Sequence, residues 1–131
     1  MDWKLFVTFD PNKIPTMDKI VKQIVVFAIM EDLTFYTFHR LFHIKSPWMP
    51  LYQMFHKTHH EFTQTITVAF AYCHPIEYIV CNWFTPYSGV FLLSWLYGRD
   101  KVHLLTTILW FNLRIAESMD GHSGFMFPRP V

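Results

Sequence analysis

Five histidines of this chain fall into two short clusters, and these clusters restrict the possible folds more than any other feature. The first cluster is HRLFH, with His39 and His43, and the second is HKTHH, with His56, His59 and His60. Residues four apart on an α-helix lie one turn apart on the same face. The spacing therefore predicts two helical segments, each of which presents a row of imidazoles.

The two clusters predict a metal site. One pair of imidazoles four residues apart can hold an ion, but such a pair arises often by chance. Two clusters within 22 residues are much harder to explain without a metal. His59 and His60 are adjacent, so on a helix their side chains diverge by about 100° and can serve two neighbouring ions. Imidazoles suit zinc, copper, iron or nickel. Five of them exceed the three or four protein ligands of one zinc ion, so a pair of metals is favoured.

One carboxylate is placed to support the first cluster. Asp32 lies seven residues before His39 and shares its helical face. A carboxylate that accepts the second ring N–H of a ligating histidine fixes the tautomer and the orientation of the ring. Asp32 is predicted to do this for His39. His103 stands alone beside the turn GRDK and is predicted to be a surface or hydrogen-bonded residue rather than a ligand.

The composition predicts an integral membrane protein. Of the 131 residues, 52% are apolar and 16% are charged, whereas a soluble domain has roughly 25% charged residues. A helix is predicted at 20–38, and the uncharged stretch 78–97 is the strongest candidate for crossing a bilayer. The turn GRDK leads into a returning helix at 102–118, in which Arg114 and Glu117 are predicted to pair.

The predicted fold class is all-α, with a transmembrane hairpin attached to polar helices that carry the histidines. The prolines of IKSPWMP end the first helix, and a further helical run with the HKTHH cluster is predicted at 51–63. No repeat or linker divides the chain, so residues 1–131 are predicted to form one domain.

Other features exclude several classes of protein. The 11 basic and 10 acidic residues nearly balance, so no nucleic-acid partner is expected. The N-terminus lacks the basic and apolar regions of a secretory signal peptide. Cys73 and Cys81 lie in apolar sequence and are predicted to be reduced core residues. The motif HExxH of zinc proteases is absent, since Glu61 follows the histidines, and this argues against a zinc-dependent membrane hydrolase.

The segments EDLTFYTFHRLFH, HKTHHEF, HPIEY and ESMDGHSGFMFP, in this order, resemble the fatty acid hydroxylase superfamily (sterol desaturase family) of integral membrane enzymes. The likeness is greatest to the C-4 methylsterol oxidases. It implies a di-iron monooxygenase of the endoplasmic reticulum membrane that uses O2 and electrons from cytochrome b5 or a similar carrier. It also implies a sterol or fatty acyl lipid as the substrate, with a sterol 4-methyl group in sterol biosynthesis as the most specific expectation.

The resemblance also implies which residues bind the two irons. Gly121 and Gly124 permit a tight backbone around His122, which is one of these ligands. His74, in HPIEY, has a counterpart in the family, and two interpretations stay open: it is a ligand, or it caps the helix that Pro75 begins, with Glu77 at the third position. The implied ligands are His39, His43, His56, His59, His60 and His122.

Two departures from the family pattern leave alternatives open. The family carries a further HxxHH box downstream of the histidine-glycine loop, and membrane helices before the first box, for which this sequence has little room. The chain is therefore interpreted as a partial domain of a longer enzyme, and the alternative is a catalytically inactive membrane fragment. A group of aromatic side chains lines a lipid slot or takes part in ordinary helix packing: Phe35, Tyr36, Phe38, Phe42, Trp48 and Phe55.

Overall fold

The computed structural model describes residues 6–61, 66–98 and 101–124. Within these ranges every regular element is a helix, and β-type pairing is limited to isolated bridges. The prediction of an all-α fold is confirmed. The elements in chain order are η1 (Pro11–Lys13), α1 (Met17–Phe42), η2 (Tyr52–His56), η3 (His59–Glu61), η4 (Thr67–Ala71), α2 (Pro75–Glu77), η5 (Tyr78–Phe84), α3 (Thr85–Tyr97) and α4 (Leu104–His122).

Helix α1 extends beyond the predicted 20–38 at both ends. It begins after Thr16, whose extended backbone forms the N-cap, and it carries Asp18 in its first turn, where a negative charge interacts favourably with the helix dipole. It ends at Phe42, with His43 as its C-cap, just before the prolines of IKSPWMP, which cannot continue a helix. The extra turn places His39 inside the helix and His43 at its C-cap.

The helices α2, η5 and α3 follow one another without a break and form one helical run from 75 to 97. The middle of this run, η5, is a π-helix. Pro86 has no N–H to donate within a helix, and the Thr85 hydroxyl instead binds the carbonyl of Cys81 at 2.7 Å. The carbonyl of Pro86 accepts a hydrogen bond from the indole N–H of Trp110 at 2.9 Å. This bond ties α4 to α3.

The core lies where α1 crosses α3. It contains Phe27, Val90 and Trp110, which are all buried. A Cβ atom placed on Gly89 would lie 2.6 Å from the Cα atom of Phe27. Such a contact is far too short, so the backbones of α1 and α3 approach this closely because residue 89 has no side chain. Cys81 is also buried and Cys73 is half-buried, and both are free thiols.

Three predictions from the sequence need correction or restriction. Residues 51–61 do not form one helix but the separate turns η2 and η3, and Thr63 lies outside the described residues. Arg114 forms its ion pair with Glu31 of α1 and not with Glu117. For the membrane hairpin predicted around 78–97, no helix in the described ranges combines the length and the apolarity needed to cross a bilayer.

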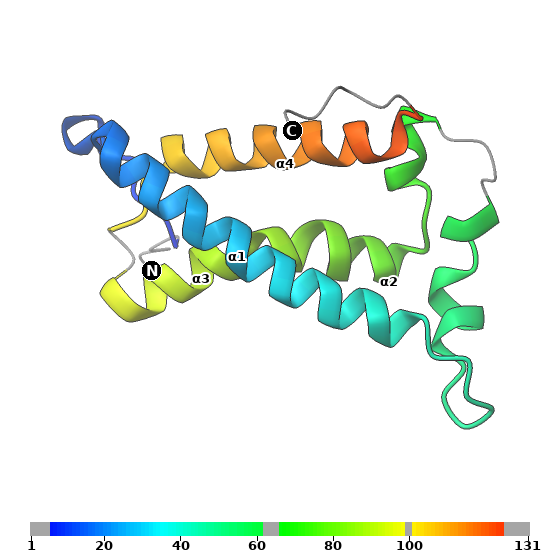
Figure 1. Ribbon diagram of the computed structural model, residues 1–131. Helices are drawn as coiled ribbons and strands as arrows, with labels where there is room; N and C mark the ends of the chain where they lie inside the picture. The colour runs from blue at the N-terminus through cyan, green and yellow to red at the C-terminus, as the bar shows by residue number, and fades with distance from the viewer. Residues whose placement is uncertain (1–5, 62–65, 99–100, 125–131) are drawn as a thin grey trace, which may run out of the picture.

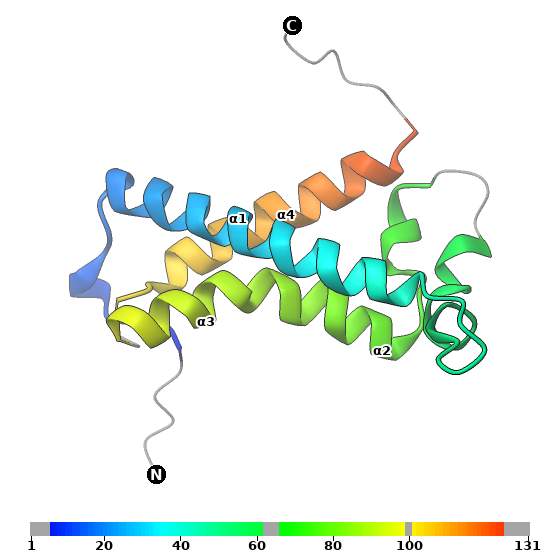
Figure 2. The same ribbon diagram turned by 60° about the horizontal axis from the view of Figure 1, so that its bottom comes forward.

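Three helix ends meet at one end of the molecule (Figures 1 and 2). The C-terminal ends of α1 and α4 and the N-terminal end of the 75–97 run all lie beside η2, η3 and η4. At the opposite end, His103 caps α4 through Nδ1 and its Nε2 lies 3.2 Å from the carbonyl oxygen of Asp10. His103 is thus hydrogen-bonded, as its isolated position predicted. All the other histidines of the described residues are carried by the elements of the first end.

Candidate metal centre

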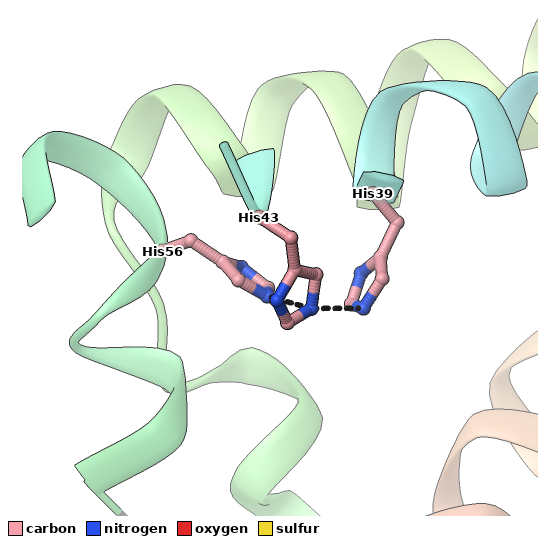
Figure 3. A group of neighbouring side chains, drawn as sticks. All are labelled: His39, His43 and His56. Carbon is pink, nitrogen blue, oxygen red and sulfur yellow. Dashed lines mark hydrogen bonds between the residues drawn. The ribbon is translucent and has the colours of Figure 1, made fainter. Parts of the chain in front are cut away.

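Three histidine rings converge at the end of α1. His39 and His43 come from its last turn, and His56 comes from η2 (Figure 3). The Nε2 atoms of His39 and His43 are 3.1 Å apart, and those of His43 and His56 are also 3.1 Å apart. One ligand atom from each ring lies within 4.8 Å of the others. The structure therefore brings the two sequence clusters together.

His60 joins this group from η3. Its Nε2 atom lies 2.9 Å from the Nε2 atom of His56. The π-helical turn of η2 and the 3-10 turn of η3 replace the predicted helix, but they still place His56 and His60 on the same side. Four Nε2 atoms thus form a connected group, which we call the four-histidine group: His39, His43, His56 and His60.

Hydrogen bonds alone do not satisfy the four-histidine group. The carboxylate of Glu77 can only accept, so the Nδ1 atom of His56 donates to it and the Nε2 atom of His56 keeps its lone pair. That lone pair faces the Nε2 atoms of both His43 and His60, and one ring at a time can donate to it. A cation held by His39, His43 and His56 would accept a lone pair from each of them, so this donor set fits a metal ion.

The spacing of the nitrogens is compatible with a shared ion. With metal–nitrogen bonds of about 2.1 Å, two ligands at a right angle have nitrogens about 3.0 Å apart, and two at the tetrahedral angle about 3.4 Å. The three separations are 2.9–3.1 Å, so each neighbouring pair of nitrogens is close enough to bind one ion.

Glu77 is a functional residue that the sequence did not assign to the metal site. Its Oε1 atom lies 2.6 Å from the Nδ1 atom of His56, and both side chains are buried. Sequence reasoning placed Glu77 in a helix cap and gave the role of supporting carboxylate to Asp32. In the structure Asp32 is exposed, and no hydrogen bond joins it to His39 among the described residues. The signal that could have indicated Glu77 is an acid in an otherwise uncharged helical run.

The surroundings favour the neutral form of His39, His43 and His60. Burial, and after it the neighbouring His56 and His43, lowers the pKa of His39 from 6.5 to about 4. Burial is also the largest cause of the lowered pKa values of His43 and His60. Metal ions bind the neutral imidazole, so at neutral pH these nitrogens are available without first losing a proton.

A second pair of histidines lies next to the four-histidine group. The rings of His59 and His122 are 5.6 Å apart, and the His59 ring is also 5.6 Å from that of His56. His122 was predicted in a loop, but it occupies the last turn of α4, where its Nδ1 atom lies 2.8 Å from the carbonyl oxygen of Ser118. The Nε2 atom of His122 is then the nitrogen with a free lone pair. Gly124 follows the helix with a positive φ of 73°.

His74 takes the capping role that the sequence left open. Its Nδ1 atom accepts the backbone N–H of Ile76 at 3.2 Å, at the start of α2. A neutral ring that accepts at Nδ1 carries its proton at Nε2. Neither nitrogen of His74 then has a free lone pair for a metal.

The aromatic residues around the site divide between packing and exposure. Phe42 is buried and stacks on the His56 ring at 6.2 Å, and Phe35 stacks on the His39 ring at 5.2 Å. Trp48 and Tyr36 are 94% and 60% exposed, so most of each side chain faces away from the protein interior.

Comparisons with known proteins match most of this chain to one family. Residues 24–131 match the family model described as fatty acid hydroxylase. The C-4 methylsterol oxidase erg25 of Schizosaccharomyces pombe is 35% identical over 114 residues, which cover 87% of this chain and 36% of that protein. The methylsterol monooxygenase erg25B of Aspergillus fumigatus is 32% identical, with the same shares covered.

A third relative is named for an aldehyde substrate rather than for a methylsterol. The very-long-chain aldehyde decarbonylase GL1-8 of Oryza sativa subsp. indica is 34% identical over 115 residues, which cover 88% of this chain and 38% of that protein. No solved structure gives a significant match. The chain thus spans a little over a third of the length of the curated relatives it matches.

Proposed function

This chain belongs to the fatty acid hydroxylase family, and on that premise we propose that it forms the iron-holding part of a membrane-bound di-iron monooxygenase that oxidises a C–H bond of a lipid. The observation that carries the proposal is the four-histidine group, in which each Nε2 atom lies 2.9–3.1 Å from that of the next histidine of the group along the chain. The family is iron-dependent, and imidazole is a ligand that suits iron.

In this proposal the four-histidine group holds the first iron, and His59 and His122 contribute to the second. Iron bound at these positions would supply the activation of O2 and the oxidation of an unactivated C–H bond. Glu77 holds the His56 ring in one tautomer, with Nε2 as the ligand atom. The buried Phe42 covers the opposite side of His56 and keeps water away from that face. His74 stays in the proposal as a helix cap.

Two further elements of the proposal are the membrane and the electron donor. Exposed apolar side chains follow one face of α1 at intervals of four residues, and an apolar stripe of this kind suits contact with lipid. The stripe is Val21, Val25, Ile29 and Leu33. We place the enzyme in the endoplasmic reticulum membrane, with cytochrome b5 or a similar carrier as the electron donor, because the family resemblance implies both.

The most specific substrate in the proposal is a sterol 4-methyl group. Two of the relatives named above are methylsterol oxidases, and this supports a sterol. A fatty acyl substrate is the second candidate, since the rice relative is named for very-long-chain aldehydes. Membranes that contain the monooxygenase of which this chain forms the iron-holding part, supplied with O2 and a reductant, should consume a 4-methylsterol and not a fatty acyl lipid, as measured by mass spectrometry.

Iron binding tests the core of the proposal directly. The purified protein, loaded anaerobically with Fe(II), should retain iron, and His43→Asn should lose most of it, because it removes the nitrogen that lies between His39 and His56. His103→Asn is the matched control: it changes a histidine at the opposite end of the molecule, and asparagine can still cap α4. Equal iron content in His43→Asn and in the unaltered protein would overturn the assignment of this site.

A further inference from the structure

One buried ion pair connects the two groups of histidines through side chains that bind no metal. Arg114 of α4 donates from Nε to the carboxylate of Glu31 of α1, and from Nη1 to the hydroxyl of Ser118. The side chain of Arg114 is 15% exposed and that of Glu31 is 7% exposed. Charges are rarely buried unless they are paired, so this pair fixes how α1 and α4 lie relative to each other.

Arg114 reaches the four-histidine group through an aromatic ring. Its guanidinium carbon lies 5.6 Å from the centre of the Phe35 ring. Phe35 in turn stacks on the His39 ring, with the ring centres 5.2 Å apart and the planes at 21°. A planar guanidinium over an aromatic face is a favourable contact. It holds Phe35 in place and thereby limits rotation of the His39 ring.

Arg114 reaches the second pair of histidines through Ser118. The hydroxyl of Ser118 accepts from Arg114, and the backbone carbonyl of the same residue lies 2.8 Å from the Nδ1 atom of His122. His122 lies in the last turn of α4, where helix ends commonly fray. A fixed Ser118 therefore helps to hold the His122 ring in place, with its centre 5.6 Å from that of the His59 ring.

Beyond the contact of Phe27 with Trp110, α1 and α4 are separated by an open space. A cavity of about 500 Å³ lies between them, and its lining includes Glu31, Phe35, Arg114, Ser118 and His122. Where a cavity separates two helices, their distance depends on the polar contacts that cross it. The Arg114–Glu31 pair is such a contact, and both of its residues line this space together with His122.

We propose that Arg114 is a positioning residue of the metal centre, which orients His39 through Phe35 and His122 through Ser118 while Glu31 fixes its own place. This inference rests on the proposed function, since it assigns a role toward the iron-binding histidines. Arg114 itself binds no metal and touches no reacting atom.

Titration with Co(II) under anaerobic conditions tests the inference, because the visible spectrum of Co(II) reports the number and geometry of its ligands. Arg114→Met keeps a long side chain without the charge or the N–H groups. It should weaken Co(II) binding by about 10- to 100-fold, as the loss of residues that orient ligands does, and it should change the spectrum. Arg114→Lys keeps the charge but lacks the planar fork, so it should recover binding in part.

Arg40→Met is the matched control. Arg40 is next to His39 in sequence, but it is exposed and binds the hydroxyl of Tyr36, so its loss should leave the Co(II) spectrum unchanged. Phe35→Leu provides a second test that leaves the ion pair intact, and it should alter the spectrum even if Arg114→Met does not fold. Folding of each variant is checked by circular dichroism at the temperature of the titration.

Three outcomes have distinct meanings. If Arg114→Met and Phe35→Leu melt at lower temperatures but bind Co(II) with the affinity and spectrum of the unaltered protein, the pair serves the fold alone and the inference fails. If the unaltered protein binds Co(II) and both variants lose affinity with a changed spectrum, the inference holds. If the unaltered protein binds no Co(II), the proposed function itself fails.

Discussion

The Oε1 atom of Glu77 lies 2.6 Å from the Nδ1 atom of His56, and both side chains are buried although 21 residues separate them in the sequence. Because the carboxylate can only accept, this contact decides which nitrogen of His56 is free to bind a metal. The relationship links η2 to the start of the 75–97 helical run, and it makes Glu77 the residue that orients the most deeply buried histidine of the site.

Glu77→Gln should weaken metal binding. The amide loses the negative charge that stabilises the His56 N–H contact, and losses of this kind lower metal affinity by about 10- to 100-fold. Competition between the protein and a chelator for Fe(II) measures the effect. Glu61→Gln, which changes an exposed acid beside His60, and Asp32→Asn serve as controls and should change the affinity less than about twofold. A larger loss with Asp32→Asn than with Glu77→Gln would return the supporting role to Asp32.

His74→Asn should leave the metal content unchanged. Asparagine is a good N-cap residue, so it can replace the bond from the His74 ring to the N–H of Ile76. Both the stability and the iron content should stay close to those of the unaltered protein. A clear drop in iron per chain, measured by elemental analysis while the thermal midpoint stays constant, would show that His74 is a ligand.

Gly89→Ala should destabilise the fold by about 1–3 kcal/mol, as is usual for overpacking in a core. The added Cβ would lie 2.6 Å from the Cα atom of Phe27, and relief requires the backbones of α1 and α3 to move apart. Gly121→Ala is the matched control, because nothing lies within 4 Å of its added Cβ. Alanine there should be neutral or should stabilise α4 by about 0.5–1 kcal/mol. Denaturant unfolding of the two metal-free variants compares them, and equal stabilities would contradict the close helix contact.

The metal-free protein should lose stability as the pH falls from about 6.5 to about 4. The pKa of His39 is lowered from 6.5 to about 4 in the folded protein, so between these values the unfolded chain binds more protons and stability rises with pH. The lowered pKa values of His43 and His60 act in the same direction. Thermal unfolding at several pH values measures the slope. His39→Asn should flatten it, and an unchanged slope in that variant would mean that other groups cause the loss.

The sequence by itself determined the helical class and the residue types of the site. Spacings of three and four residues are local, and a helical turn or a turn such as η2 and η3 keeps residues at these spacings close in space. The HRLFH and HKTHH clusters could therefore be read directly, and the charge-poor composition indicated long helices. The same local spacing predicted the wrong ion pair for Arg114. It suggested Glu117, three residues away, whereas the actual partner, Glu31, lies on another helix.

The tertiary structure decided which side chains support and connect the ligands. Glu77 meets His56 across 21 residues, and Arg114 meets Glu31 across 83. No spacing in the sequence predicts either contact, because both depend on where α1, α4 and the 75–97 run lie relative to one another. The crossing at Gly89 and Phe27 sets those positions by close backbone packing. His59 and His122 come together for the same reason: α4 returns along α1 and brings its last turn to the histidine end of the molecule.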